Sequence, residues 1–190
     1  MKRLVLIGLL FATGCAPWMQ VGGRFEPSSR LFSVETPQGW MRLDTDDYLL
    51  MSEDGPFLQY VMIQGRPLDR SFRHTRKKFR EAMLPEEAAE VLIDEIGSDP
   101  SVLNFEIVEN IPATISGLEG FRLVFKYRTR DGLKLKTLYY GLLAGDRFYG
   151  IRYTAAERYY FTKDLRTFGK ILGSFRLNDV QIAGTNRRRS

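Results

Sequence analysis

The sequence contains little of what most catalytic centres require. Its 190 residues include 1 cysteine and 1 histidine, which excludes an internal disulfide framework, a zinc site built mainly from thiolates and any pair of imidazoles. The Gly-x-Ser-x-Gly nucleophile elbow and the glycine-rich phosphate loops are also missing. We therefore expect no metal, no cofactor and no catalytic residue.

An excess of one charge is also missing from most of the chain. There are 28 basic and 23 acidic residues, and the difference is carried by Lys2, Arg3, Arg187, Arg188 and Arg189 at the two ends. The sequence between them is neutral overall, so the basic pI does not predict a nucleic-acid partner. Hydrophobic residues make up 44% of the chain, which predicts one globular domain with a real core.

The N-terminus carries a short apolar run rather than a membrane span. Lys2 and Arg3 precede nine residues from Leu4 to Ala12, far fewer than the roughly 20 that cross a bilayer as a helix. This pattern is typical of a secretory signal peptide. The small residues before Cys15 resemble the lipobox of bacterial lipoproteins: Ala12-Thr13-Gly14-Cys15.

The lipobox resemblance implies cleavage before Cys15 and acylation of that cysteine, with palmitate among the acyl chains, so that the protein is anchored in a membrane. Residue 16 is alanine and not the aspartate that, in this family, favours the inner membrane. The resemblance therefore implies an outer-membrane anchor that faces the periplasm. The alternative is an ordinary signal peptide cut near Gly14, with Cys15 as a free thiol.

Composition divides the chain into four segments. Residues 1–14 form the signal peptide, and residues 15–30, rich in glycine, proline and serine, form a flexible tether. Residues 31–177 form the single domain. Residues 178–190 form a flexible basic tail, which is either solvated or in contact with anionic lipid headgroups.

The pattern within the domain predicts an α+β fold. Helical spacing of apolar residues predicts helices at residues 69–83, 85–96 and 162–174. Alternating or extended runs predict strands at residues 31–36, 40–43, 48–51, 57–64, 104–111, 120–129, 133–143 and 147–154. Both faces of the C-terminal strands are largely apolar, so we expect an antiparallel β-sheet covered by helices on both faces.

The turn at Arg130-Asp131-Gly132 sets the register of the central hairpin. A three-residue loop with Gly132 in the left-handed conformation pairs Tyr127 with Leu135. The same register places four basic residues together at the hairpin tip: Lys126, Arg128, Lys134 and Lys136. Like charges directly opposite one another destabilise a sheet. We therefore expect their repulsion to be compensated either by carboxylates from a helix or by an anionic ligand or partner.

Several motifs resemble PsbP-like domains over residues 31–177. They are Phe32-Ser33-Val34-x-x-Pro37-x-Gly39-Trp40, the strand Tyr149-x-Ile151-x-Tyr153-x-Ala155, and a closing Ile171-Leu172-x-Ser174-Phe175. The resemblance implies the α/β/α sandwich of that family. Its better-known members are accessory or binding proteins, among them an extrinsic photosystem II subunit and a nuclear-transport factor, and its bacterial members include periplasmic lipoproteins.

Two further basic residues, Arg73 and Lys77, lie in the expected helix at 69–83 and join the hairpin tip as candidates for binding an anion or a partner. The predicted function is a lipid-anchored periplasmic binding or accessory module, without catalysis, that contacts an envelope protein or an anionic ligand. One alternative is an envelope hydrolase or other enzyme that uses His74. Another is a structural stabiliser of a larger envelope complex, which requires a broad exposed apolar patch.

Overall fold

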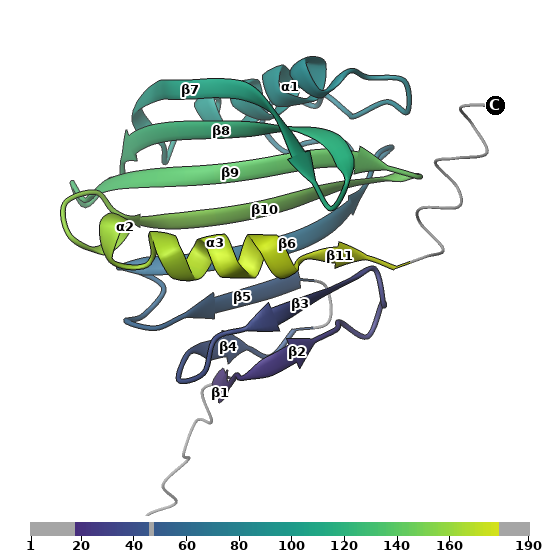
Figure 1. Cartoon of the computed structure of the whole chain (residues 1–190). Helices are drawn as coiled ribbons and strands as arrows, with labels where there is room; N and C mark the ends of the chain where they lie inside the picture. The colour runs from purple at the N-terminus through teal and green to yellow at the C-terminus, as the bar shows by residue number, and fades with distance from the viewer. Residues whose placement is uncertain (1–17, 46–47, 179–190) are drawn as a thin grey trace, which may run out of the picture.

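An eight-stranded antiparallel sheet dominates the computed structural model, which describes residues 18–45 and 48–178 (Figure 1). The strand order is β1-β4-β5-β6-β10-β9-β8-β7. The strands are β1 (Trp18–Gln20), β4 (Met41–Leu43), β5 (Tyr48–Ser52), β6 (Gln59–Pro67), β7 (Leu103–Ile115), β8 (Leu118–Arg128), β9 (Lys134–Ala144) and β10 (Arg147–Ala156).

A second, three-stranded sheet contains β2 (Gly23–Phe25), β3 (Phe32–Thr36) and β11 (Arg176–Leu177). Strand β1 pairs with β4, and β2 pairs with β3. The expectation of a flexible tether is therefore wrong for residues 18–25, which are built into the two sheets. Gly23, the first residue of β2, adopts a φ of 83°, a left-handed conformation that glycine takes at little cost.

Helix α1 (Pro85–Gly97) packs on strands β7, β8 and β9. Pro85 occupies the first turn, and the backbone N–H of Leu84 donates to Glu87 Oε2 at 2.9 Å, which caps the helix start. The buried stripe of α1, which includes Ala89 and Leu92, joins the odd-numbered side chains of β8, such as Leu123, in one apolar cluster.

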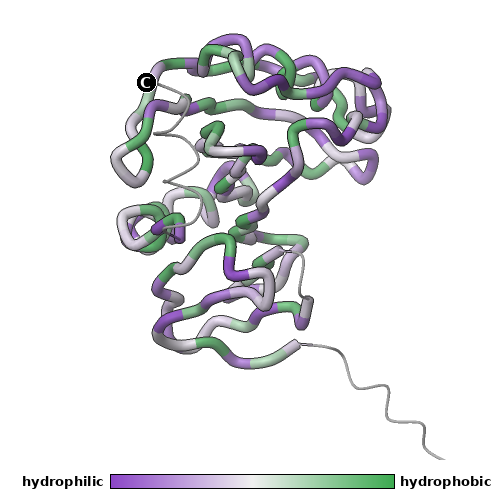
Figure 2. The backbone as a smooth tube through the Cα atoms, turned by 90° about the vertical axis from the view of Figure 1, so that its right-hand side faces the viewer, coloured by the Kyte–Doolittle hydropathy of each residue, from purple (hydrophilic) through white to green (hydrophobic). Residues whose placement is uncertain are grey.

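The even-numbered side chains of β8 face the opposite way. Val124 belongs to a second cluster with Phe168 and Ile171, which lie on α3 (Leu165–Ser174). A short helix, α2 (Tyr160–Lys163), precedes α3. Figure 2 views α3 end-on beside the strands.

The segment before α1 differs from its sequence expectation. Residues 68–84 form turns and extended chain rather than the helix expected at 69–83. The many cations at helical spacing there repel one another, and the segment is held instead by its two aromatic anchors. Phe72 and Phe79 are buried in the apolar cluster that α1 forms with β8, and Arg76 adopts a φ of 60°.

Helices thus contribute only part of the cover on each face. One face is covered by α1 and the irregular segment 68–84, and the other by α2, α3 and the small sheet. Within the described residues, no helix combines the length and apolar character needed to cross a membrane.

Candidate functional site

The hairpin tip has the register that its turn predicts. Arg128 pairs with Lys134 and Lys126 pairs with Lys136 across β8 and β9, and Gly132 adopts a φ of 85°. We call these four basic residues the tip cluster. Arg128 and Lys134 are exposed, whereas Lys126 and Lys136 are partly covered.

Glu157 neutralises one of the four positive charges of the tip cluster. Lys126 Nζ lies 2.6 Å from Glu157 Oε1, and that hydrogen bond raises the pKa of Lys126 and lowers the pKa of Glu157. Lys136 Nζ lies 4.7 Å from the centre of the Phe161 ring, a cation–π contact. Among the described residues, Arg128 and Lys134 have no carboxylate within ion-pair distance.

A surface depression of about 370 Å³ adjoins the tip cluster. Its walls come from β7, β8, β9 and the residue after β10, and they are Asn104, Glu106, Lys126, Tyr127, Arg128, Lys134 and Glu157. Two carboxylates face three cations there, so the depression keeps a positive surplus. An anionic group at the tip would therefore meet a net positive charge.

Arg73 and Lys77 do not extend the tip cluster. Lys77 Nζ forms an ion pair with Asp94, and the backbone N–H of Arg73 donates to Glu95 Oε1 at 3.0 Å, so both residues sit against α1. The tip cluster lies on the opposite face of the sheet, because Lys136 packs on Phe161 of α2, which belongs to the same apolar cluster as Phe168 of α3. The two groups of basic residues therefore form separate surfaces.

His74 has a serine and a carboxylate nearby, in an order that differs from a catalytic triad. His74 Nε2 lies 3.6 Å from Asp99 Oδ2, and Ser101 Oγ donates to Asp99 Oδ1 at 2.7 Å. In a triad the histidine stands between the serine and the carboxylate so that it can take the hydroxyl proton. Here the carboxylate occupies the middle place, and Ser101 donates to Asp99 instead of to His74.

A pocket of about 450 Å³ lies on the α1 face, under the same hairpin. Its lining combines the end of α1, the chain that follows it, the turn at Arg130 and the inward face of β8, β9 and β10. Arg152 reaches it from β10, although the flanking Ile151 and Tyr153 point into the opposite core. This pocket is not among the sites predicted from the sequence, because only the alternation along β10 indicates that Arg152 lies on the face opposite Ile151 and Tyr153.

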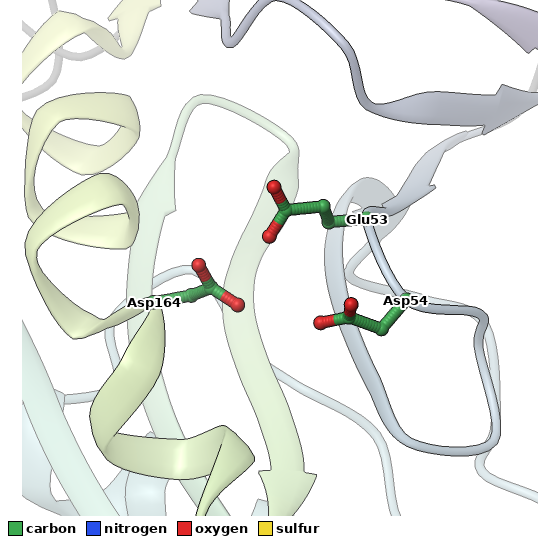
Figure 3. A group of neighbouring side chains, drawn as sticks. All are labelled: Glu53, Asp54 and Asp164. Atoms are coloured by element: carbon green, nitrogen blue, oxygen red, sulfur yellow. The ribbon is translucent and has the colours of Figure 1, made fainter.

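A cluster of three carboxylates lies near the start of α3. Glu53 and Asp54 follow β5, Asp164 separates α2 from α3, and their carboxylates point toward one another (Figure 3). Lys163 Nζ lies 2.9 Å from Glu53 Oε2 and 2.6 Å from Asp54 Oδ2. Carboxylates are ligands for hard cations such as Ca²⁺, so these residues are the described group best suited to one, but Lys163 already supplies a positive charge.

Asp164 differs from the other two carboxylates because it is only 5% exposed, and its Oδ2 has no hydrogen-bond partner. Burial, together with the nearby Glu53 and Asp54, raises the pKa of Asp164. Spacing along the chain does not predict this cluster, because Asp164 lies more than a hundred residues after Glu53 and Asp54.

The exposed apolar side chains of edge strand β7 do not form a broad patch. Leu103, Ile107, Val108 and Ile111 are between 37% and 47% exposed. Acidic residues interrupt them, and the pairing with β8 has two irregularities. Charges, bulges and proline on an edge strand hinder strand addition by another chain.

Comparisons with known proteins show similarity at the level of the fold. No family model matches the chain, and no curated protein matches it. The solution structure of a cyanobacterial PsbP (CyanoP) from Synechocystis matches with a TM-score of 0.57 and 12% identity over 90% of this chain and 99% of that chain. The Ran-binding protein Mog1p of Saccharomyces cerevisiae matches with a TM-score of 0.54 and 9% identity, over 85% and 98%. The chain therefore has a PsbP/Mog1-like fold.

Proposed function

We propose that this protein is a lipid-anchored, non-catalytic accessory module of the bacterial envelope that binds an acidic segment of a partner protein through the tip cluster. The observation that carries this proposal is the direct pairing of Arg128 with Lys134 at the exposed end of the hairpin. Opposed like charges lower stability, and an anionic partner relieves that repulsion when it binds.

The surroundings of the tip favour a peptide or protein partner over a small inorganic ion. The cations spread along two strands, and Glu106 and Glu157 lie among them in the same depression. Such mixed surfaces select a partner by charge pattern, because a misplaced carboxylate meets a carboxylate. The PsbP/Mog1-like fold also serves a Ran-binding protein, which supports protein binding as a use of this architecture.

The proposed anchor is an acylated Cys15 exposed by removal of residues 1–14, in the outer membrane and facing the periplasm. Cys15 lies outside the described residues, and the described chain begins at Trp18 in edge strand β1. Six strand spacings of about 4.8 Å separate β1 from β8, roughly 30 Å in all. An anchor just before β1 therefore directs that edge toward the membrane and the tip cluster away from it (Figure 1).

The anchor is tested by the denatured intact mass of protein extracted from membranes in mild detergent. The expected mass begins at Cys15 and includes two or three acyl chains, and Cys15→Ser is expected to abolish both the acylation and the membrane attachment. A wild-type mass without acyl chains, or unchanged attachment of Cys15→Ser, contradicts the anchor.

The partner surface is tested by photo-crosslinking in cells. A photoreactive amino acid at Leu133, which is 37% exposed beside the tip, is expected to capture a partner with an acidic segment. The double variant Arg128→Gln/Lys134→Gln is expected to lose the captured band, and a probe at exposed Lys170 on α3 serves as the matched control. Equal capture from both positions, or capture that survives the double variant, contradicts the proposal.

A further inference from the structure

We infer that the pocket on the α1 face binds a small organic monocarboxylate with an apolar body, and that Arg152 receives its carboxylate. This inference goes beyond the proposed function and does not rest on it. The pocket opens on the face that α1 covers, whereas the tip cluster lies on the opposite face of the same strands.

Arg152 has more hydrogen-bond donors than its surroundings satisfy. A guanidinium carries five N–H groups. Arg152 Nη2 lies 3.1 Å from Met62 Sδ, which is a weak acceptor, and Nε is buried with no hydrogen-bond partner. Within the described residues Arg152 forms no ion pair, and its Cζ lies 5.3 Å from the centre of the Tyr60 ring. A carboxylate accepts hydrogen bonds from two guanidinium N–H groups at once, so it could satisfy the donors that Arg152 leaves without a partner.

The neighbouring tyrosines do not act as counterions. Burial, and then the neighbouring Tyr60, raise the pKa of Tyr127, and burial raises the pKa of Tyr139 to about 12. Both phenols therefore remain protonated and neutral at physiological pH. Tyr127 is hydrogen-bonded to Tyr60 and Tyr139 to Gln64, so these side chains are fixed around Arg152 rather than free to neutralise it.

The rest of the pocket suits an apolar body of modest size. Ile96, Val102 and Phe125 contribute apolar surface, and the volume of about 450 Å³ lies within the range of small-molecule sites. Thr137 and Thr154 are hydrogen-bonded to each other at 2.9 Å, so their hydroxyls are already partnered. The site thus offers one strong anion receptor beside an apolar wall.

The charges of the lining favour an anion with a single negative charge. Asp99 and Asp131 are part of the lining, together with Arg130. Hydrogen bonds from Ser101, together with the nearby His74 and Arg73, outweigh partial burial and lower the pKa of Asp99, which keeps it ionised. A phosphate dianion meets these carboxylates, whereas a monocarboxylate places its one charge at Arg152 and its apolar part against the wall.

The inference is tested by calorimetric titration of the full-length protein in mild detergent with four probes. Benzoate and octanoate represent the proposed class, benzyl alcohol lacks the charge, and inorganic phosphate carries more of it. We expect benzoate or octanoate to bind measurably, and Arg152→Met to weaken that binding by about tenfold to a hundredfold, because a charge-assisted contact is lost. The Nε–H signal of Arg152 in the NMR spectrum of ¹⁵N-arginine-labelled protein is expected to shift on binding.

Arg66→Met is the matched control, because Arg66 lies on the neighbouring strand, also has a buried Nε without a partner, and does not line the pocket. Arg152→Lys keeps the charge and loses the planar fork, so intermediate binding is expected. Thermal melts of each variant establish that it is folded. The inference is overturned if neither carboxylate binds, if benzyl alcohol or phosphate binds as well as they do, or if folded Arg152→Met binds like the wild type. Arg128→Gln/Lys134→Gln is expected to bind benzoate or octanoate normally, which separates this result from the proposed function.

Discussion

The face of the sheet under α3 is closed by packed aromatic rings, whereas the face under α1 keeps a partly unpaired arginine beside a pocket. On the first face, Phe168 lies 5.5 Å from the Tyr153 ring and 6.2 Å from the Tyr140 ring. On the second, Arg152 occupies the strand position next to Tyr153 and lacks an ion-pair partner among the described residues. The closed face stabilises the fold, and the open face has polar groups available for a ligand.

The largest loss of stability is expected when an aromatic ring is removed from the face under α3. Phe168 is 1% exposed, so Phe168→Ala is expected to destabilise the protein by about 3 to 5 kcal/mol through lost burial and a cavity. Urea unfolding measures the change. Phe57→Ala removes the same ring from a side chain that is 87% exposed and is expected to cost less than about 0.5 kcal/mol. Similar losses for the two variants contradict the packing of the closed face.

Two glycines define where the α1 face is open, because Phe121 and Phe148 beside Gly141 belong to the apolar cluster under α1 and pack tightly away from the Arg152 pocket. A methyl group at Gly141 would come within 2.6 Å of Phe121 Cε1 and 2.8 Å of Phe148 Cζ, so Gly141→Ala is expected to cost about 1 to 3 kcal/mol. Gly169 lies within α3 with open space around it, so Gly169→Ala is expected to stabilise by about 0.5 to 1 kcal/mol. Thermal melts compare the two, and equal signs would contradict the close approach at Gly141.

Two carboxylates on the opposite faces should respond to pH with opposite signs. Partial burial raises the pKa of Glu95, but hydrogen bonds from Thr75, His74 and Arg73 outweigh it and lower that pKa overall. The stability from Glu95 is present above its unfolded pKa of about 4.3 and is lost as the pH falls through the lower folded value. Glu95→Gln is therefore expected to destabilise at pH 7 by about 1 to 2 kcal/mol, and by less at pH 3.

Asp164 on the α3 face has a raised folded pKa, so its ionised form opposes folding at pH 7. Asp164→Asn is expected to stabilise at pH 7 by about 1 kcal/mol, with the gain shrinking as the pH falls through the folded pKa toward about 4. Urea titrations at several pH values measure both variants. The same sign of change for Glu95→Gln and Asp164→Asn at pH 7 would refute the contrast.

The smallest net effect on stability is expected at Arg152. Replacing a poorly paired, partly buried cation by an apolar side chain of similar length is often neutral or stabilising, so Arg152→Met is expected to stabilise the protein by between zero and about 1 kcal/mol. Urea unfolding at neutral pH measures it. A loss above about 3 kcal/mol would show that Arg152 belongs to the framework rather than to an open site.

Local chemistry predicted the hairpin well because its register depends on a short segment. The turn at Arg130-Asp131-Gly132 correctly places Arg128 opposite Lys134. The antiparallel sheet and the helix at Pro85–Gly97 follow equally from alternation and helix signals within a few residues.

Tertiary contacts decided the features that the sequence pattern missed. Residues 69–83 have helical spacing, yet Glu95 accepts the backbone N–H groups of Arg73, His74 and Thr75 and holds the segment in another conformation. The Arg152 pocket depends on which side chains of three strands meet under α1. Neither arrangement can be inferred from spacing alone, since both depend on residues distant in the sequence.

The most direct test of the proposed function is native mass spectrometry of the protein purified from its own membranes in mild detergent, with Arg128→Gln/Lys134→Gln measured in parallel. We expect the wild type to carry the acyl mass and a protein partner, and the double variant to keep the acyl mass and lose the partner. Retention of the partner by the folded double variant, or a wild type that carries no partner, would contradict it.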